Sequence, residues 1–231
     1  MTDDKQTTKD RLLDAAEQLF AEKGFDGASI RDLAAAAGVN VAAVNYHFQG
    51  KDNLYREVIK RRFVDQRDAS LAALASLLEK TDGQPALDRV IATMVGQHVA
   101  GALAAPGQPT FMALMGREMN ADRSIENTTF FKQLIAPMFD SYSAALLKAC
   151  PDLDQERINW FMASIVGQVH HFIFRRMKWN SLPEDSESRA FMKRAFPALT
   201  LPREDYVKEV TAHITRFSTA AIEGLRGEVT T

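Results

Sequence analysis

A short segment of the chain, residues 29–51, carries polar side chains of the kinds that contact a nucleic acid. Asn45 has the amide group that pairs with adenine or binds a phosphate, and the side chains of Tyr46 and His47 can donate hydrogen bonds to phosphate oxygens. Alanines between them would let a helix approach base edges and touch thymine methyl groups. The candidate contact residues are Ser29, Asn40, Ala42, Ala43, Asn45, Tyr46, His47 and Lys51.

Two short helices must position these side chains. Ser29 and Asp32 have the spacing of a capping box at the start of a helix over about 30–37. Asn40 is the expected N-cap of a second helix over about 41–47. Two short helices joined by a turn that contains glycine form a helix-turn-helix, whose second helix fits the major groove of DNA.

A helical wheel assigns two faces to the second of these helices. The inner face, which we expect to pack on the preceding helices, is formed by Val41, Val44 and Phe48. The outward face consists of Ala42, Ala43 and Tyr46, with Asn45 and His47 on its flanks. The sequence therefore predicts a shallow outward surface suited to base edges.

Local charge supports this interpretation. Residues 29–67 contain seven basic and four acidic side chains, whereas residues 1–28 contain four basic and seven acidic ones, so the net charge of −2 hides the local balance. Lys51 follows Gly50 at the start of the next helix, where the helix dipole disfavours a cation. A phosphate near its ammonium group and the helix N–H groups would account for this position.

Apolar residues over the rest of the chain recur at intervals of three and four, which predicts an all-helical fold. The expected helices cover residues 10–24, 51–80, 84–104, 109–120, 127–149, 154–179 and 203–226, with a short helix at 187–195. We place the domain boundary within the long helix, near residues 50–67. This divides the chain into a three-helix, helix-turn-helix domain over 1–55 and a larger helical domain over 56–231.

The sequence lacks the patterns of enzymes and of resident cofactors. It contains no Walker-type loop, no GxSxG, no GxGxxG after a strand, no HExxH and no paired CxxC. Cys150 is the single cysteine, which excludes a disulfide within the chain and any multi-cysteine metal site. His170 and His171 would point about 100° apart on a helix. We therefore expect no catalysis, no cofactor and no metal site.

Membrane association is not expected either. No window approaches 18 consecutive apolar residues. The first ten residues are polar and lack the apolar core of a signal peptide. The expectation is a soluble cytoplasmic protein.

The segment RLLDAAEQLFAEKGFDGASIRDLAAAAGVNVAAVNYHFQGKDNLYREVI resembles the DNA-binding domain of TetR/AcrR-family transcriptional repressors. The resemblance covers about residues 8–60 and rests on the order and spacing of Ala16, Leu19-Phe20, Gly24-Phe25, Ser29, Ala37-Gly38-Val39, His47-Phe48, Lys51 and Leu54. It implies a homodimer that binds a palindromic double-stranded DNA operator. It also implies that DNA is released when a small-molecule effector, whose identity the sequence does not disclose, occupies the C-terminal domain.

Two positions depart from the family pattern. Asn45 stands where the family often has a DNA-contacting tyrosine, and Tyr46 follows it, so either residue could supply the phosphate contact. Gly50 stands where a serine is common before the lysine. The run VNVAAVNYHF and parts of the C-terminal half further resemble a CecR-type branch of the family.

Two long apolar stripes occur in the predicted helices at 154–179 and 203–226. Their spacing suits either a four-helix interface between two copies or packing within one chain. The family resemblance implies the interface, which would then contain Ile158, Phe161, Met162, Ile165, Val169, Phe172, Val210, Ile214 and Phe217.

Methionine and aromatic residues concentrate in the middle of the chain. Methionine adapts to irregular surfaces, so these residues could line a pliable apolar cavity, although each could equally belong to an ordinary core. The candidate effector-pocket residues are Met94, Phe111, Met112, Met115, Phe131, Met138, Phe139, Tyr142, His170 and Phe174.

Several alternatives remain open in the sequence. The helix-turn-helix could serve only packing in a helical protein-interaction module that binds no DNA. A member of the same family could also activate transcription. Lys60-Arg61-Arg62 could face DNA or solvent, and Arg175-Arg176 could anchor an anionic effector or form a solvated helix end.

Overall fold

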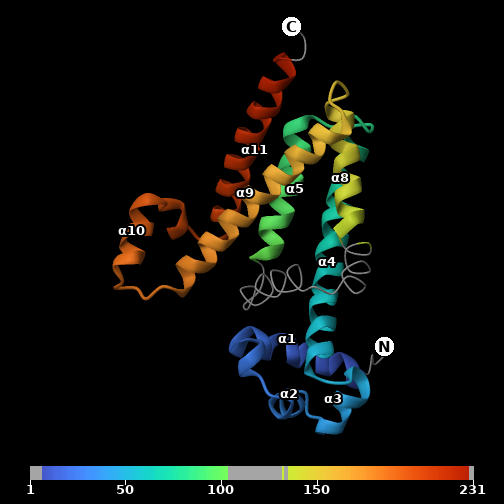
Figure 1. Ribbon diagram of the computed structural model, residues 1–231, viewed down its shortest axis with the longest axis vertical. Coiled ribbons are helices and arrows are strands. Elements are labelled where there is room, and N and C mark those ends of the chain that lie inside the picture. The colour runs from blue at the N-terminus through green and yellow to red at the C-terminus, as the bar shows by residue number, and fades with distance from the viewer. Residues whose placement is uncertain (1–6, 104–131, 133–134, 229–231) are drawn as a thin grey trace. The chain divides into compact units, whose positions relative to one another are not determined.

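The computed structural model describes residues 7–103, 132 and 135–228, and every extended regular element within them is a helix (Figure 1). This confirms the all-helical prediction. The predicted helix at 109–120 and the first part of the one at 127–149 lie outside the described residues.

Packing divides the described chain into two compact units, with the boundary inside α4 (Lys51–Lys80) between Asp65 and Gln66. This boundary falls within the range 50–67 expected from the sequence. The division of function at residues 55 and 56 stays a prediction. Each unit is described by itself below.

The first unit contains α1 (Thr8–Gly27), α2 (Ile30–Ala36), α3 (Val41–Phe48) and the beginning of α4. Gly24 interrupts α1 with a φ of 72°, a backbone conformation that glycine adopts without steric cost, and this break accounts for the helix end predicted there. The core is formed by one side chain or more from each helix, including Leu12, Ala16, Phe20, Leu33, Val44, Phe48, Leu54, Val58 and Ile59.

The second unit contains the later part of α4 together with α5 (Leu87–Ala102), α8 (Ala136–Ala149), α9 (Gln155–Ser181) and α11 (Arg203–Glu228). Helix α5 packs against α8, α9 and α11, and α9 packs against α8 and α11. The apolar side chains between them form the core, among them Val90, Ile91, Val95, Val99, Leu146, Ile158, Ile165, Val169, Ile173 and Ile214.

Helices α9 and α11 run antiparallel, as two contacts show. Arg226 near the end of α11 forms an ion pair of 2.6 Å with Asp152 just before α9. Tyr206 near the start of α11 donates a hydrogen bond of 2.8 Å to the carbonyl of Phe172 in the later part of α9. The middle of one helix therefore lies beside the middle of the other.

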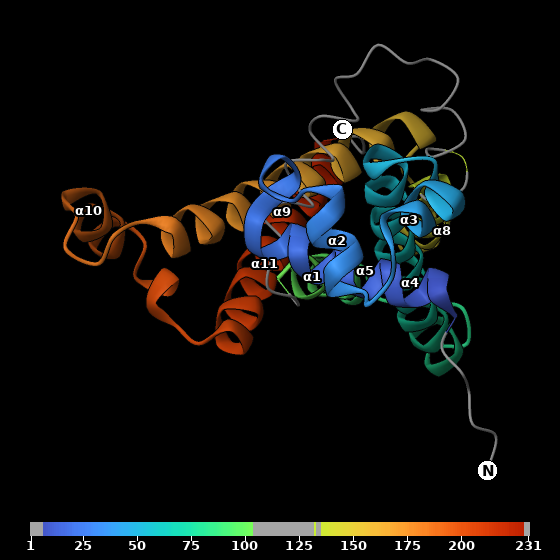
Figure 2. The ribbon, with the colours of Figure 1, turned by 90° about the horizontal axis from the view of Figure 1, so that it is seen from below.

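The segment between α9 and α11 forms α10 (Glu187–Ala195) and the short 3-10 helix η2 (Pro197–Thr200). Within the second unit, α10 lies beyond the end of α9, away from α5 and α8 (Figures 1 and 2), and none of its side chains is buried. The sequence predicted α10 with the observed bounds but missed η2.

Arginine side chains fasten this segment to α9. Arg189 donates to the carbonyl of Leu182 at 2.7 Å, and Arg176 donates to the carbonyl of Leu199. The guanidinium group of Arg175 lies 3.8 Å from the ring centre of Phe196. Arg175 and Arg176 therefore hold the α9–α11 connection, a third role beside the effector anchor and the solvated helix end considered from the sequence.

Within the described residues, no helix is long and apolar enough to cross a membrane.

Candidate functional site

The helix-turn-helix in the first unit begins with a reciprocal cap. The backbone N–H of Asp32 donates to the hydroxyl of Ser29 at 3.1 Å, and the N–H of Ser29 donates to the Asp32 carboxylate at 3.1 Å. The Ser29 hydroxyl also donates to the Asp32 carboxylate at 2.8 Å. The two bonds that the carboxylate accepts hold the pKa of the Asp32 carboxyl below its usual value of 3.8, the bond from the hydroxyl being the larger cause. The predicted capping box is thus confirmed, and the Ser29 hydroxyl already has a partner within the protein.

The turn between α2 and α3 is fixed by backbone and side-chain bonds. Gly38 has a φ of 64°, the left-handed conformation that closes the end of α2. Arg11 on α1 donates to the Gly38 carbonyl at 3.3 Å. Asn40 then caps α3, because its side-chain oxygen accepts the N–H of Ala43 at 2.8 Å. The turn is therefore tied to α1 as well as to the helix it starts.

Helix α3 presents most of the predicted outward side chains to solvent. Tyr46 is 84% exposed, Ala42 and Asn45 are exposed, and Ala43 and His47 are partly exposed. The ring of Tyr46 lies edge-on to that of His47, with centroids 5.0 Å apart. A tyrosine so exposed on a capped helix contributes little to the fold and is available to a partner.

The inner face of α3 is smaller than predicted. Val44 and Phe48 are buried in the first unit, but Val41 is 40% exposed, so its placement in the inner cluster is wrong. Val41 is the first residue of α3 and lies one turn before Val44, at the free end of the helix. It therefore belongs to the exposed surface beside Ala42.

Lys51 has protein partners in this structure. Its ammonium group donates to the carbonyls of Phe25 at 2.7 Å and Ala28 at 2.9 Å, and it lies 4.2 Å from the ring centre of Phe25. These carbonyls belong to the end of α1, where a cation is electrostatically favourable. The position of Lys51 is thus explained without a phosphate, which corrects the reason given from the sequence, and a DNA contact by Lys51 stays a prediction.

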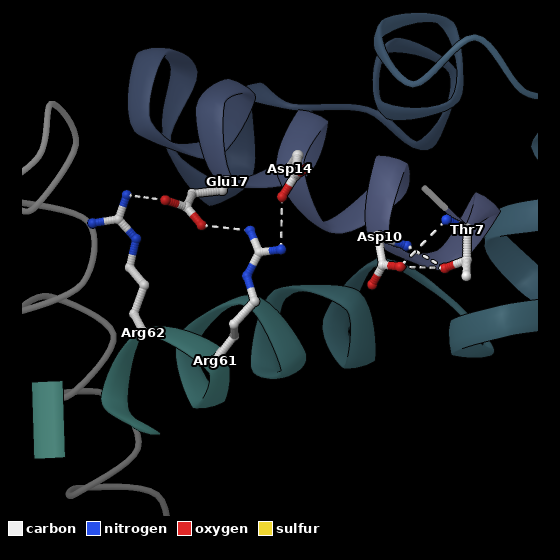
Figure 3. A network of polar contacts seen from close by, with 6 residues as sticks. All are labelled: Thr7, Asp10, Asp14, Glu17, Arg61 and Arg62. Carbon is white, nitrogen blue, oxygen red and sulfur yellow. Dashed lines mark hydrogen bonds and ion pairs between the residues drawn. The ribbon is translucent and has the colours of Figure 1, made fainter. Parts of the chain in front are cut away.

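An ionic network joins α1 to α4 (Figure 3). Arg61 forms ion pairs with Asp14 at 2.6 Å and with Glu17 at 2.7 Å, and Arg62 pairs with the same Glu17. Burial acts to lower the pKa of Arg61, but the bonds from Glu17 and Asp14 outweigh it and raise the pKa overall.

This network reduces the basic charge expected on the first unit. Arg61 and Arg62 have carboxylate partners, and Lys51 binds carbonyls, so at least three of the basic residues that the first unit contributes to 29–67 are engaged within the protein. The sequence analysis missed the network. Its signal was the pair Asp14 and Glu17, which lie one turn apart on α1.

The interior of the second unit contains polar groups. The hydroxyls of Ser70 on α4 and Tyr142 on α8 are 3.0 Å apart, and both side chains are buried. The imidazoles of His98 on α5 and His170 on α9 approach to 5.2 Å between ring centroids. The side-chain amide of Gln66 donates to the carbonyl of His98 at 3.4 Å.

These contacts test part of the predicted effector pocket. Tyr142 and Met94 are buried, His170 is partly buried and faces His98, and Phe174 is exposed on α9. Met138 and Phe139 on α8 are partly exposed. The remaining predicted residues, Phe111, Met112, Met115 and Phe131, lie outside the described residues. Phe174 is thus corrected to a surface position, because it lies on the outer face of α9.

The predicted dimer interface also needs correction. Six of its residues are buried within the single chain between α9, α11 and their neighbours: Ile158, Met162, Ile165, Val169, Val210 and Ile214. They cannot contact a second copy because the protomer's own helices cover them. Phe161 and Phe172 are partly exposed, and Phe217 is 60% exposed.

Cys150 and the histidines form no metal site in the described part of the chain, where no group of three or more histidine, cysteine or acidic residues could hold an ion. Cys150 is buried, and burial raises the pKa of its thiol, which disfavours the reactive thiolate. His171 points away from His170 and accepts a hydrogen bond from Arg175 at 2.7 Å.

A capped helix-turn-helix with an exposed second helix, followed by a helical unit whose apolar interior includes a few polar side chains, is the architecture of a helix-turn-helix DNA-binding protein. Comparison with known families agrees. The description "Bacterial regulatory proteins, tetR family" matches residues 12–58, and "Tetracyclin repressor-like, C-terminal domain" matches residues 92–200. The two matches together span more than half of the chain, which belongs to the TetR family of transcriptional regulators. This is a family of DNA-binding regulators, not of enzymes.

Curated relatives match over part of the chain. The chain is 31% identical over 94 residues to the probable HTH-type transcriptional regulator YttP of Bacillus subtilis, covering 41% of this chain and 45% of the relative. It is 38% identical over 52 residues to IcaR of Staphylococcus aureus, a negative regulator of the biofilm operon icaADBC, covering 22% of this chain and 28% of the relative. The chain thus spans less than half the length of either relative.

Solved structures extend the likeness of fold to nearly the whole chain. The fatty acid degradation regulator FadR from Bacillus halodurans aligns with a TM-score of 0.59 at 15% identity, over 91% of this chain and 96% of that one. A transcriptional regulator from Rhodococcus sp. RHA1 aligns with a TM-score of 0.57 at 21% identity, over 90% and 94%. At these identities the likeness concerns the fold alone.

Proposed function

We propose that the protein is a homodimeric repressor that binds a palindromic operator through α3 and releases it when the second unit binds a small molecule. The observation that carries the proposal is the outward face of α3, where Tyr46 projects beside Ala42 and Asn45 from a helix capped at its start. Side chains of these types read base edges and grip phosphates in a major groove. Repression is favoured over activation because the relative IcaR is named a negative regulator.

The structure supports a division of work among the predicted contact residues. Ser29 and Asn40 use their side chains to cap α2 and α3, so we expect them to orient helix N-termini toward phosphates. The side chains of Tyr46 and Asn45 do not cap a helix, and we expect these two residues to contact DNA directly. The resemblance to a CecR-type branch remains a prediction about subfamily that bears on neither role.

A revised surface replaces the predicted dimer interface. The exposed faces of α9 and α11 carry large apolar side chains at their edges and small ones between, in a heptad-like spacing. Trp160 is 68% exposed and Phe217 60% exposed, and the antiparallel arrangement of the two helices places both in the same half of the surface. The proposed interface consists of Trp160, Ala163, Ser164, Gly167, His171, Phe174, His213, Phe217, Ala220, Ala221, Gly224 and Leu225.

Glycines in this surface favour close approach of a second copy. A side chain added at Gly167 or at Gly224 would meet no atom of the protomer within 4 Å, so the protomer itself does not require glycine at either position. A partner helix packed against the face would require it. Two such helices from each copy would form a four-helix interface.

DNA binding is tested with the full-length protein and fluorescently labelled duplexes from the region upstream of its own gene, by anisotropy at several salt concentrations. We expect specific binding whose affinity falls steeply with salt. Tyr46→Ala should weaken specific binding by about tenfold or more. Tyr46→Phe separates the hydroxyl from the ring, and equal losses in both variants would assign the contact to the hydroxyl.

One result would contradict the proposal of specific DNA binding. A folded dimer that selects no sequence from the upstream region or from a random duplex library would indicate a protein-interaction module instead. Reporter expression from the bound promoter in cells distinguishes repression, which lowers expression in the presence of the protein, from activation, which raises it.

The dimer is tested by light scattering after size-exclusion chromatography. Phe217→Asp places a charge in the proposed interface without disturbing the protomer core, since Phe217 is exposed, and should give monomers. The matched control is Phe191→Asp on α10, whose side chain is 55% exposed but lies outside the proposed interface. Monomers from Phe191→Asp and dimers from Phe217→Asp would place the interface elsewhere.

A further inference from the structure

The two facing histidines inside the second unit, His98 and His170, have the properties of a binding site. Their rings are nearly perpendicular, at 82°, with centroids 5.2 Å apart, and they come from α5 and α9, which pack against each other. Each residue keeps a partly exposed surface, and neither imidazole has a hydrogen bond to the described residues. Polar groups in such surroundings normally have partners, so two adjacent imidazoles without any are available to a ligand.

The two imidazoles lack a negatively charged partner among the described residues. Burial lowers the pKa of His98 to about 4, with a further lowering from His170, and burial also lowers the pKa of His170. Both rings are therefore neutral near pH 7 in the free protein. No described carboxylate affects either pKa, although a carboxylate is the group that normally stabilises a buried imidazolium.

Several other polar and titratable side chains on the packed helices have partners other than the pair. On α8, the Tyr142 hydroxyl bonds to Ser70, and on α11 the Tyr206 hydroxyl bonds to the carbonyl of Phe172. His213 on α11 is exposed, and its ring lies against Phe172. His171 on α9 accepts from Arg175, and from α4 the neutral amide of Gln66 reaches only the backbone of His98. The pair thus has no built-in counter-charge among the described residues.

We propose that His98 and His170 bind the acidic head group of the effector, an organic acid with an apolar body, and take up one proton as it binds. One imidazole becomes an imidazolium that pairs with the carboxylate, and the other donates a neutral N–H bond to it, so the charge enters the interior already compensated. The sequence around the pair carries buried apolar side chains, with Met94 one turn before His98, Val169 directly before His170 and Ile173 about one turn after it, and these surroundings suit an apolar body. The proposal rests on the proposed effector-controlled function.

A metal ion is the alternative occupant of two histidines. It requires three or four protein or substrate donors, and the described residues supply no third histidine, cysteine or acidic group here. An acid needs only donors, which two imidazoles supply. The acid is therefore the occupant that the surroundings favour.

The probes are octanoate and its neutral isostere octanamide, titrated into the full-length protein by calorimetry at pH 6, 7 and 8. If one proton is taken up per octanoate, the affinity should fall by about tenfold for each unit of pH between the free and bound pKa values. Buffers of different ionisation enthalpy should report uptake of one proton. Octanamide should bind far more weakly, and Zn²⁺ should not compete with octanoate.

Nuclear magnetic resonance of the protein with ¹⁵N-labelled histidine locates the proton. The chain has five histidines, and we expect the signals of one member of the pair to change from neutral imidazole to imidazolium when octanoate is added at pH 7. His98→Gln and His170→Gln should each weaken octanoate binding by tenfold or more. The control, Lys148→Gln, changes an exposed side chain on α8 that belongs neither to the pair nor to the proposed dimer interface, and it should leave octanoate binding unaltered.

Several results would overturn the proposal: no saturable octanoate binding, equal binding of octanamide, retained binding in both pair variants, or a pair that stays neutral in the complex. Tight Zn²⁺ binding that displaces octanoate would assign the pair to a metal. Since the resonance experiment uses the wild-type chain, misfolding of a variant does not remove the test. Operator binding is measured on the same protein without octanoate. If the protein binds its operator but not octanoate, the proposal about the histidine pair fails while the proposed DNA-binding function stands.

Discussion

Polar side chains occupy different places in the two units. In the first unit they lie at the surface, where Ser29 and Asn40 cap helices and Arg61 pairs with α1, while the core between the helices is apolar. In the second unit, Ser70, Tyr142, His98 and His170 lie in or near the interior. Caps and ion pairs fix the geometry of a surface that must fit a duplex of constant shape. Interior polar groups suit a ligand that enters the unit and must be recognised there.

The largest expected effect is on the apolar core of the first unit. Phe20→Ala removes a buried ring that lies 4.7 Å from Tyr55 between centroids, and it should lower the free energy of unfolding by about 3–5 kcal/mol. Both tryptophans, Trp160 and Trp179, belong to the second unit. In the Phe20→Ala variant, circular dichroism should therefore report loss of helix at a lower urea concentration than the one at which the tryptophan fluorescence changes. Coincident transitions at the wild-type midpoint would contradict the division into units.

The interior polar pair is the corresponding test of the second unit. Tyr142→Phe leaves the buried Ser70 hydroxyl without its partner and should cost about 1–3 kcal/mol, measured by urea unfolding with tryptophan fluorescence. Tyr46→Phe, which removes the same atom from an exposed ring, is the control and should leave stability unaltered. Equal effects in the two variants would remove the contrast between interior and surface polar groups.

Lys51 tests whether a polar group in the first unit is structural or contacts DNA. Lys51→Met deprives the carbonyls of Phe25 and Ala28 of their donor and should cost about 1–2 kcal/mol of unfolding free energy. If Lys51 serves only the fold, the slope of log affinity against log salt stays that of the wild type. A slope reduced by about one unit, with stability unaltered, would instead identify a phosphate contact. The exposed Lys60→Met is the control for loss of charge alone.

The smallest expected effect concerns the α2 cap. Ser29→Ala removes the hydroxyl that accepts from Asp32 and should cost about 1 kcal/mol. Because the folded pKa of Asp32 lies below 3.8, its carboxylate stabilises the fold above that pH and loses this effect as pH falls through the depressed value. The difference in unfolding free energy between wild type and variant, measured by urea unfolding, should therefore be largest at pH 7 and should narrow as pH falls below 3.8 through the depressed pKa. A difference in unfolding free energy that does not change with pH would show that the Ser29 cap stabilises the helix independently of the ionised carboxylate.

Periodicity and capping signals predicted much of the fold. The bounds of α3, α4, α9 and α11 were predicted to within about two residues, because caps and apolar spacing are local properties. The sequence could not decide where long-range partners lie. The two stripes, one with Ile158 and the other with Ile214, suited both an interface and a core, and only the packing of α5, α9 and α11 shows that these residues are core.

The candidate site followed the same rule. Tyr46 was placed outward by its angle on the helix, a local property that the structure bears out. Lys51 was misinterpreted because its partners, Phe25 and Ala28, are brought to it by the turn after α1. As a possible metal ligand, His170 was considered with its sequence neighbour His171, whereas its spatial neighbour is His98 from another helix.

The connection between α9 and α11 is held through its main chain, so part of this contact does not depend on which side chains the connection carries. Arg176 and Arg189 bind main-chain oxygens of Leu199 and Leu182, and every residue type offers such an oxygen. Substitutions at exposed positions along this connection, away from the buried Leu199 and from Phe196, should be tolerated so long as the two guanidinium groups remain and the backbone keeps its path. Surface-exposed α10 is therefore the place in the second unit where a tag or fluorophore could be attached with least disturbance to the rest of the molecule.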